Sequence, residues 1–270
     1  MPENTVIDKT PAPITRQSII QDLLRLGVRP GMTIIVHSSL SALGWVCGGA
    51  PTVVSALMDV ITEDGTIVMP TQTGNYSDPA NWSRSPVPQP WWEIIYEAMP
   101  AFDPLTTPSF KMGVIAENFR TTPGVVRSNH PQVSFAAWGK HAQQIIADHS
   151  LTYGLGEQSP LARIYDLAGW VLLLGVGYDN DTSFHLAEYR SPGAKEVVLG
   201  APIIEDGKRI WKRFADIDID SELFPQIGAL FEERGHVTIN RVGIAECRLF
   251  SQPASVDFAV DWYVRARRGL

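Results

Sequence analysis

Two short β-branched runs on either side of a helical segment constrain the fold more than any other feature of this sequence. "MTIIVHSSL" (32–40) stops at a polar turn, "APTVVSALMDVI" (50–61) has helical periodicity, and "GTIVMPTQ" (65–72) is a second strand. The order strand, helix, strand is typical of a βαβ unit with a parallel sheet. We therefore expect an α/β fold.

The rest of the chain extends this pattern. A helix is expected from about Thr15 to Gly27, and "WVLLLGVG" (170–177) predicts a buried strand. "EDGKR" (205–209) predicts a turn between two β-like arms. No Pro/Gly/Ser-rich linker divides the chain, so we expect a loose tail over residues 1–14 and a single domain over residues 15–270.

Composition excludes several classes of function. The 22 basic and 29 acidic residues give a net charge of −7, with no Lys/Arg-rich run, so a nucleic-acid partner is not expected. No run of about 18 apolar residues predicts a membrane span, and the first residues lack a signal-peptide pattern. We expect a cytoplasmic protein, whose negative field would favour a cationic substrate.

A Ser/Gly-rich turn joins the first strand of the βαβ unit to its helix. Glycine allows close approach of a ligand to the backbone, and the free amides of a helix start attract anions such as phosphate. The spacing fits neither GxxxxGK[ST] nor GxGxxG. A well-capped turn without a ligand is the alternative. The residues concerned are Ser38, Ser39, Ser41, Gly44, Gly48, Gly49 and Pro51.

The stretch "YDNDTSFHLAEYR" (178–190) follows the buried strand and places a histidine at the start of a helix. With Thr182 as the expected N-cap, His185 and Glu188 lie one turn apart on the same face. The C-terminal end of a parallel strand is where open α/β sheets bind ligands. His185 could be a general base, a metal ligand or a solvated helix residue. A metal would need further ligands, of which His130 supplies at most one, without HExxH-like spacing.

A catalytic histidine needs an acid that orients it and stabilises its charged form. Glu188 is beside His185, and Asp216 and Asp218 lie on the second arm of the predicted hairpin. Spacing alone does not choose among these three carboxylates.

Six ordered blocks resemble the aminoglycoside N3-acetyltransferase family, also called the antibiotic N-acetyltransferase family. This resemblance implies a single-domain α/β sandwich of three layers around a mixed sheet, unrelated to the GNAT acetyltransferase fold. It also implies acetyl-coenzyme A as the cofactor. The blocks are "VHSSLSALGWVCGG" with "TVVSAL", "GTIVMPTQT", "TPSFKMGVIAENFR", "RSNHPQVSFAAWG", "SPLARIYDLAGWVLLLGVGYDNDTSFHLAE" and "EDGKR…FADID".

The resemblance also implies roles for individual residues. His185 corresponds to the family's general base, and Asp216 to its acidic partner; relatives have glutamate there, so Asp218 and Glu188 stay open as alternatives. The expected cofactor-binding residues are Ser38, Ser39, Leu40, Ser41, Gly44, Gly48, Gly49, Thr52, Phe110 and His130. The expected acceptor-binding residues are Tyr76, Asp78, Asp103, Asp216 and Asp218.

The function implied is transfer of an acetyl group to the 3-amino group of a 2-deoxystreptamine aminoglycoside within a ternary complex, which confers resistance. The sequence leaves a homodimer open. One alternative is a histidine- or metal-dependent hydrolase that uses His130, His185 and Glu188, and another is a coenzyme A-binding protein without activity. Release of free thiol from acetyl-coenzyme A distinguishes the acetyltransferase from both.

Overall fold

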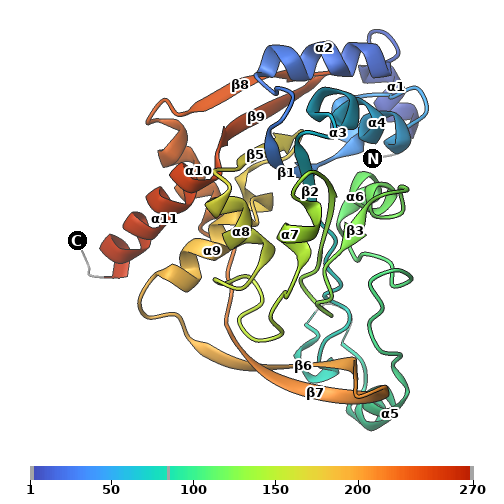
Figure 1. Cartoon of the computed structure of the whole chain (residues 1–270), viewed down its shortest axis with the longest axis vertical. Helices are drawn as coiled ribbons and strands as arrows, with labels where there is room; N and C mark the ends of the chain where they lie inside the picture. The colour runs from blue at the N-terminus through green and yellow to red at the C-terminus, as the bar shows by residue number, and fades with distance from the viewer. Residues whose placement is uncertain (1–2, 84–85, 268–270) are drawn as a thin grey trace.

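A seven-stranded mixed sheet forms the centre of the protein (Figure 1). The computed structural model describes residues 3–83 and 86–267. The strand order is β3-β4-β2-β1-β5-β9-β8, with β1 parallel to both β2 and β5 and antiparallel pairs toward each edge. The strands are β1 (Thr33–Ser38), β2 (Thr66–Pro70), β3 (Val126–Arg127), β4 (Phe135–Gly139), β5 (Trp170–Leu174), β8 (Val237–Val242) and β9 (Ala245–Ser251).

Helices cover both faces of this sheet. Successive side chains of β1 point to opposite faces: Ile34 and Val36 join one apolar core, and Ile35 joins the other. α2 (Arg16–Leu26), α4 (Ala50–Ile61) and α6 (Gly113–Arg120) cover the first core. α7 (Ala142–Ile146), α8 (Pro160–Asp166), α9 (Ser183–Arg190), α10 (Phe224–Glu232) and α11 (Gln252–Arg267) cover the second. The predicted three-layer α/β architecture with a mixed sheet is confirmed.

The predicted hairpin forms a separate two-stranded sheet. β6 (Glu196–Glu205) pairs with β7 (Lys208–Ile217) along its whole length and extends away from the main sheet toward α5 (Trp92–Ala98). Tyr96 of α5 packs edge-on against Trp211 of β7, with ring centroids 4.8 Å apart. The short helices that complete the chain are α1 (Glu3–Lys9), α3 (Leu40–Leu43), η1 (Pro79–Asn81), η2 (Gln89–Trp91) and η3 (Tyr178–Asn180).

The expectation of a loose N-terminal tail is wrong for the residues that the structure describes. Residues 3–9 form α1, where Val6 is buried, and the Thr10 hydroxyl accepts a hydrogen bond from the Trp45 amide at 2.8 Å. Ile14 forms a β-bridge with Val46. The segment is ordered because its few apolar side chains meet the loop after α3, a long-range contact that local composition does not reveal.

Gly139, the last residue of β4, gives a test of the sheet. Its φ is +103°, and an added Cβ would lie 2.1 Å from the Gly65 carbonyl oxygen. Gly139→Ala therefore combines backbone strain with a backbone clash and should lower the free energy of unfolding by at least about 2 kcal/mol in urea denaturation. Gly31→Ala is the control, because Gly31 has a φ of +83° but open space at its Cβ position. Equal losses in the two variants would contradict the clash.

Candidate active site

Two cavities meet at Ser38, the last residue of β1. We call the larger one, of about 630 Å³, the outer cavity, and the smaller one, of about 190 Å³, the inner cavity. Ser38 lines both of them. The outer cavity is lined by Val6, Ser38, Ser39, Leu40, Ser41, Gly44, Trp45, Val46, Gly48, Gly49, Gly113 and Val114. The titratable residues that line the inner cavity are His37, Lys111, Asp179, Asp181 and His185.

The outer cavity contains most of the residues expected to bind the cofactor. All seven of the expected Ser, Leu and Gly residues between 38 and 49 line it. Thr52 does not: its hydroxyl donates a hydrogen bond to the Cys47 carbonyl at 2.7 Å. Gly48 and Gly49 have φ of +82° and +63°, which turns the chain sharply into α4. Thr52 therefore supports the glycine turn rather than facing the cavity.

The turn that leads into α6 forms a wall shared by the two cavities. Lys111 and Met112 line the inner cavity, and Gly113 and Val114 line the outer one. Lys111 has a φ of +60°, which is unusual for a side chain other than glycine. Phe110 is 40% exposed and is not among the residues lining either cavity, so its expected contact with the cofactor stays a prediction.

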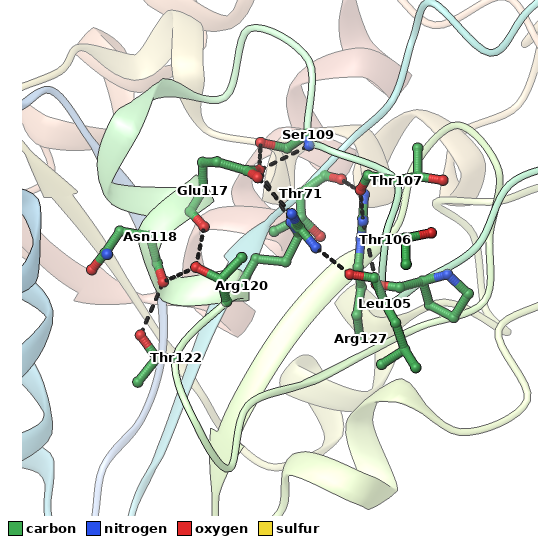
Figure 2. A network of polar contacts seen from close by, with 12 residues as sticks. Thr71, Leu105, Thr106, Thr107, Ser109, Glu117, Asn118, Arg120, Thr122 and Arg127 are labelled. Atoms are coloured by element: carbon green, nitrogen blue, oxygen red, sulfur yellow. Dashed lines mark hydrogen bonds and ion pairs between the residues drawn. The ribbon is translucent and has the colours of Figure 1, made fainter.

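A polar network holds this wall in place, as Figure 2 shows. The Glu117 carboxylate of α6 accepts hydrogen bonds from the Ser109 amide at 2.8 Å and from Arg120. The buried Arg127 guanidinium donates to the carbonyl oxygens of Thr107 and Thr71, both at 2.5 Å. Burial lowers the pKa of Arg127 to about 10, so it stays charged at neutral pH. These contacts tie the loop before Lys111 to α6 and to the end of β2.

His185 lies in the first turn of α9 and faces the inner cavity. Its Nδ1 is 2.5 Å from Glu188 Oε2, and Glu188 Oε1 accepts a hydrogen bond from the Asp220 amide at 3.0 Å. The ring of Phe224 packs against the imidazole with centroids 4.7 Å apart. A carboxylate at Nδ1 favours the tautomer that carries its proton there, which leaves Nε2 free to accept another.

Asp216 was expected to orient His185, and the structure corrects this. Its Oδ1 accepts hydrogen bonds from the Tyr189 hydroxyl at 2.5 Å and the Ile217 amide at 2.8 Å, and its Oδ2 accepts one from the Gly154 amide at 3.2 Å. Burial raises the pKa of Asp216. Because both oxygens are occupied, Asp216 anchors the end of β7 to α9, and Glu188 is the hydrogen-bonding partner of His185.

Asp218 does not orient His185 either. Its carboxylate is exposed and pairs with Lys195 Nζ at 3.2 Å. Instead it lines a hollow of about 440 Å³ together with Glu188, Lys195, Asp220 and Glu222. We call this the acidic hollow.

His130 was expected to line the cofactor tunnel, and this was wrong. It is 1% exposed, its Nδ1 accepts hydrogen bonds from the amides of Gln132 and Val133, and its Nε2 lies 3.3 Å from the Leu151 carbonyl oxygen. The ring packs against His149 with centroids 4.7 Å apart. Both ring nitrogens are taken up by the backbone, so His130 is a core residue of the described structure.

The three residues expected to border the acceptor have structural contacts of their own. Asp78 accepts hydrogen bonds from the Ala80 amide at 2.9 Å and the Tyr96 hydroxyl at 2.6 Å. Asp103 accepts one from the Leu105 amide at 2.7 Å, and Tyr76 packs edge-on against a neighbouring phenylalanine. None of the three lines the inner or outer cavity. Their contact with an acceptor stays a prediction.

Four of the five described titratable residues of the inner cavity were missed from the sequence, which predicted only His185; the missed residues are His37, Lys111, Asp179 and Asp181. His37 ends the apolar run of β1, and Asp181 precedes α9, where its Oδ1 accepts a hydrogen bond from the Ser183 amide at 3.0 Å. The cap of α9 therefore comes from Asp181 and not from the Thr182 side chain. Burial and then His185 lower the pKa of His37 to about 3, and burial raises the pKa of Asp181 to about 7. The sequence did carry a signal for His37, which is a polar residue in an otherwise apolar strand.

Two further searches cover only residues 3–83 and 86–267. Within these ranges, no three His, Cys, Asp or Glu side chains are grouped so that they could hold a metal ion. No helix in the same ranges combines the length and the apolar character needed to cross a bilayer.

Comparison with known proteins places the chain among aminoglycoside-modifying enzymes. A family model described as "Aminoglycoside 3-N-acetyltransferase" matches residues 35–264. An aminoglycoside N(3')-acetyltransferase-like protein of Bacillus subtilis, YokD, is 51% identical over 96% of each chain. Aminoglycoside N(3)-acetyltransferase VII of Streptomyces paromomycinus is 36% identical over 97% of this chain and 96% of the relative.

Solved structures agree with the sequence relatives. The crystal structure of YokD superposes with a TM-score of 0.98 at 50% identity and covers 99% of each chain. The binary complex of AAC-IIIb with CoASH has a TM-score of 0.84 at 31% identity, over 95% of this chain and 98% of that one. AAC-VIa bound to sisomicin has a TM-score of 0.85 at 31% identity, over 95% and 99%.

The buried histidine pair predicts how stability depends on pH. Burial lowers the pKa of His149 to about 4 and that of His130 well below its ordinary value. Below about pH 6.5 the unfolded chain binds protons that the folded protein does not, so stability should fall as pH decreases toward 4, by up to about 1.4 kcal/mol per pH unit for each histidine. Urea denaturation at pH 7 and pH 5 measures this loss.

Matched variants test whether the buried histidines His130 and His149 cause this loss of stability at low pH. His149→Gln should lower stability at pH 7, because contacts with Ser128 and Gly154 change, but should reduce the difference between pH 7 and pH 5. His236→Gln changes an exposed histidine and should leave the difference in stability between pH 7 and pH 5 unchanged. A difference that is unchanged in His149→Gln would contradict the assignment.

Proposed function

Because the chain belongs to the aminoglycoside 3-N-acetyltransferase family, we propose that the outer cavity binds acetyl-coenzyme A and the inner cavity receives the acceptor amine. The observation that carries this proposal is the position of Ser38, which lines both cavities, while His185 faces the inner one. A group that enters from the outer cavity and an amine held in the inner cavity would meet beside the same residue. Such an arrangement suits direct transfer within a ternary complex.

The outer cavity has the features that coenzyme A requires. Its walls are small serine and glycine residues with Trp45, Val46 and Val114, so a long, flexible arm can lie close to the backbone. The glycine turn at its edge leads into the first turn of α4, where the positive end of the helix dipole attracts phosphate. The AAC-IIIb structure carries CoASH, which supports the same donor here. When bound, acetyl-coenzyme A supplies an acetyl group activated as a thioester.

His185 would act as the general base. Glu188 holds Nδ1 at 2.5 Å and is itself held by the Asp220 amide, so Nε2 is the nitrogen available to accept a proton from the attacking amine. The Glu188 carboxylate then stabilises the imidazolium that forms. General-base assistance of this kind is worth about 10² to 10⁴ in rate.

The start of α3 would stabilise the negative charge that develops on the acetyl carbonyl oxygen. α3 begins at Leu40, directly after Ser38 and Ser39, and the first amides of a helix have no intrahelical partner. The hydroxyls of Ser39 and Ser41 lie 3.5 Å apart and line the outer cavity. Donors fixed before the reaction stabilise developing charge effectively.

The acceptor would be an aminoglycoside, acetylated on the 3-amino group of its 2-deoxystreptamine ring, and the activity would confer resistance. AAC-VIa binds sisomicin, and this chain carries a net charge of −7 that favours a polycation. The acidic hollow next to Glu188, lined by Asp218, Asp220 and Glu222, would bind further ammonium groups of the acceptor. In this role Asp218 contacts the substrate and not the base.

Substitutions in α9 test the base. His185→Ala should lower kcat at least about a hundredfold while the affinity for acetyl-coenzyme A stays nearly unchanged, because the base acts on the amine. Glu188→Gln should lower kcat by about tenfold or more, since the amide stabilises the imidazolium less than a carboxylate does. Thiol release from acetyl-coenzyme A with a panel of aminoglycosides measures both.

Asp218→Asn is the matched control for Glu188→Gln. It removes one carboxylate from the acidic hollow and should raise KM for the acceptor more than it lowers kcat. An unchanged kcat in His185→Ala would remove His185 from the mechanism. A larger fall of kcat in Asp218→Asn than in Glu188→Gln would reassign the partner of the histidine. No thiol release by folded wild-type protein with any aminoglycoside would contradict the proposed function itself.

A substitution at Val114 tests whether the outer cavity binds coenzyme A, and it leaves His185 and Glu188 unchanged. It is 59% exposed, lines the outer cavity and lies in the first turn of α6, where a carboxylate is compatible with the helix dipole. Val114→Glu should therefore fold normally and weaken coenzyme A binding at least about tenfold, because it adds bulk and negative charge to a cavity proposed to hold a polyanion. Calorimetric titration with coenzyme A measures this, with Val114→Ile as the control. Equal affinity in the two variants would place the donor elsewhere.

A further inference from the structure

A buried carboxylate and imidazole at the inner cavity have no part in the mechanism described so far. His37 and Asp181 both line this cavity, and their side chains are 6% and 0% exposed. His37 Nε2 is 3.9 Å from Asp181 Oδ1, which is too long for a hydrogen bond. Neither His37 Nε2 nor Asp181 Oδ2 has a hydrogen-bond partner in the described structure. Buried polar groups are ordinarily hydrogen-bonded, so two such atoms at the wall of the cavity that His185 faces point to a functional role.

Asp181 is linked to His185 through the backbone. Its Oδ1 accepts a hydrogen bond from the Ser183 amide at 3.0 Å, and the Thr182 carbonyl accepts one from the His185 amide at 3.1 Å. Asp181 therefore fixes the turn from which the imidazole projects. A carboxylate at this end of α9 is also favourable toward the helix dipole.

Asp181 is linked to His185 through space as well. Both side chains line the inner cavity, of about 190 Å³, so an ionised carboxylate and a protonated ring there attract each other. His37 does not neutralise the carboxylate, because burial and the neighbouring His185 keep the pKa of His37 at about 3. Burial raises the pKa of Asp181 to about 7, so a positive charge on His185 would readily favour the ionised carboxylate.

The other charged groups around His185 define the setting of this interaction. Glu188 contacts Nδ1 of the ring directly, and Asp216 is bound by Tyr189 and backbone amides. The titratable groups that face the ring from the surrounding elements are His37 of β1, Lys111 of the turn before α6, Asp179 and Asp181 around η3, Glu188 of α9 and Asp216 of β7. Among the carboxylates of this set, Asp181 is the one that is wholly buried and retains an unpartnered oxygen.

We propose that Asp181 is a positioning residue for His185: its carboxylate fixes the first turn of α9 and supplies a second buried negative charge, beside Glu188, that stabilises the protonated ring during acetyl transfer. His37, whose Nε2 lies 3.9 Å from Asp181 Oδ1, stays uncharged and does not neutralise this carboxylate. The proposal rests on the proposed role of His185 as the base. It adds a residue that acts through His185 and does not touch either substrate.

The experiment measures the titration of the His185 ring directly. The chain has six histidines, and the signal of His185 in NMR spectra is assigned by its loss in His185→Asn. Asp181→Asn keeps a side-chain oxygen that can cap α9 but removes the charge. The midpoint of the His185 titration should fall by at least about half a pH unit in this variant, and kcat should fall at least about tenfold with unchanged affinity for coenzyme A.

Three further variants keep the proposal open to contradiction. Asp181→Ser also caps a helix without charge, so it should reproduce the shift if the asparagine variant does not fold. His37→Gln replaces one uncharged side chain by another and should leave the midpoint nearly unchanged. Asp59→Asn removes a carboxylate from the surface, where Asp59 pairs with Arg16, and should have no effect.

Each outcome decides the proposal. An unchanged midpoint and kcat in folded Asp181→Asn or Asp181→Ser would overturn it and leave Asp181 as a helix cap. An equal shift of the His185 midpoint in His37→Gln would also overturn the proposal, because local repacking and not the loss of charge would then explain the shift. The titration does not depend on turnover. Absence of thiol release by the wild-type protein would therefore contradict the proposed function, whereas an absent shift in an active enzyme would contradict this inference alone.

Discussion

The contact between His185 Nδ1 and the Glu188 carboxylate is the interaction on which the site depends. It joins two residues of one helix turn, but it is completed from outside that helix, because the Asp220 amide binds the second oxygen of Glu188. The segment that carries Asp220 is in turn fixed by Asp216, which binds Tyr189 and Gly154. The long β6–β7 hairpin therefore influences the base through its anchored end, although no hairpin side chain bonds to the imidazole in the described structure.

The fold brings this histidine to the end of β1, beside the two cavities that meet at Ser38. β1 lies between its parallel neighbours β2 and β5, so its C-terminal end at Ser38 and the exit from β5 toward α9 share one edge of the sheet. The serine and glycine turn after β1 forms the outer cavity, and the residues after β5 form much of the inner one. The wall between them comes from the turn before α6, and the hydrogen bonds of Arg127 and Glu117 tie the loop that precedes it to the end of β2 and to α6 (Figure 2).

The sequence predicted the features that depend on local patterns. The βαβ unit, the hairpin and the seven residues from Ser38 to Gly49 that line the outer cavity follow from periodicity, turn chemistry and family resemblance. Asp216 was predicted as the partner of His185, with Asp218 and Glu188 as alternatives, because spacing does not reveal that Tyr189 and the Gly154 amide bind Asp216. His130 resembled a cofactor-lining residue, but backbone amides and Leu151 enclose it. The packing of residues 3–14 against the loop after α3 was likewise a long-range contact that local composition did not reveal.

The tautomer of the resting His185 ring tests the central claim most directly. If Glu188 fixes the imidazole for general-base catalysis, nitrogen-detected NMR of the wild-type protein at neutral pH should show Nδ1 protonated and Nε2 unprotonated. The opposite tautomer, with the proton on Nε2, would leave no lone pair facing the acceptor and would contradict the account.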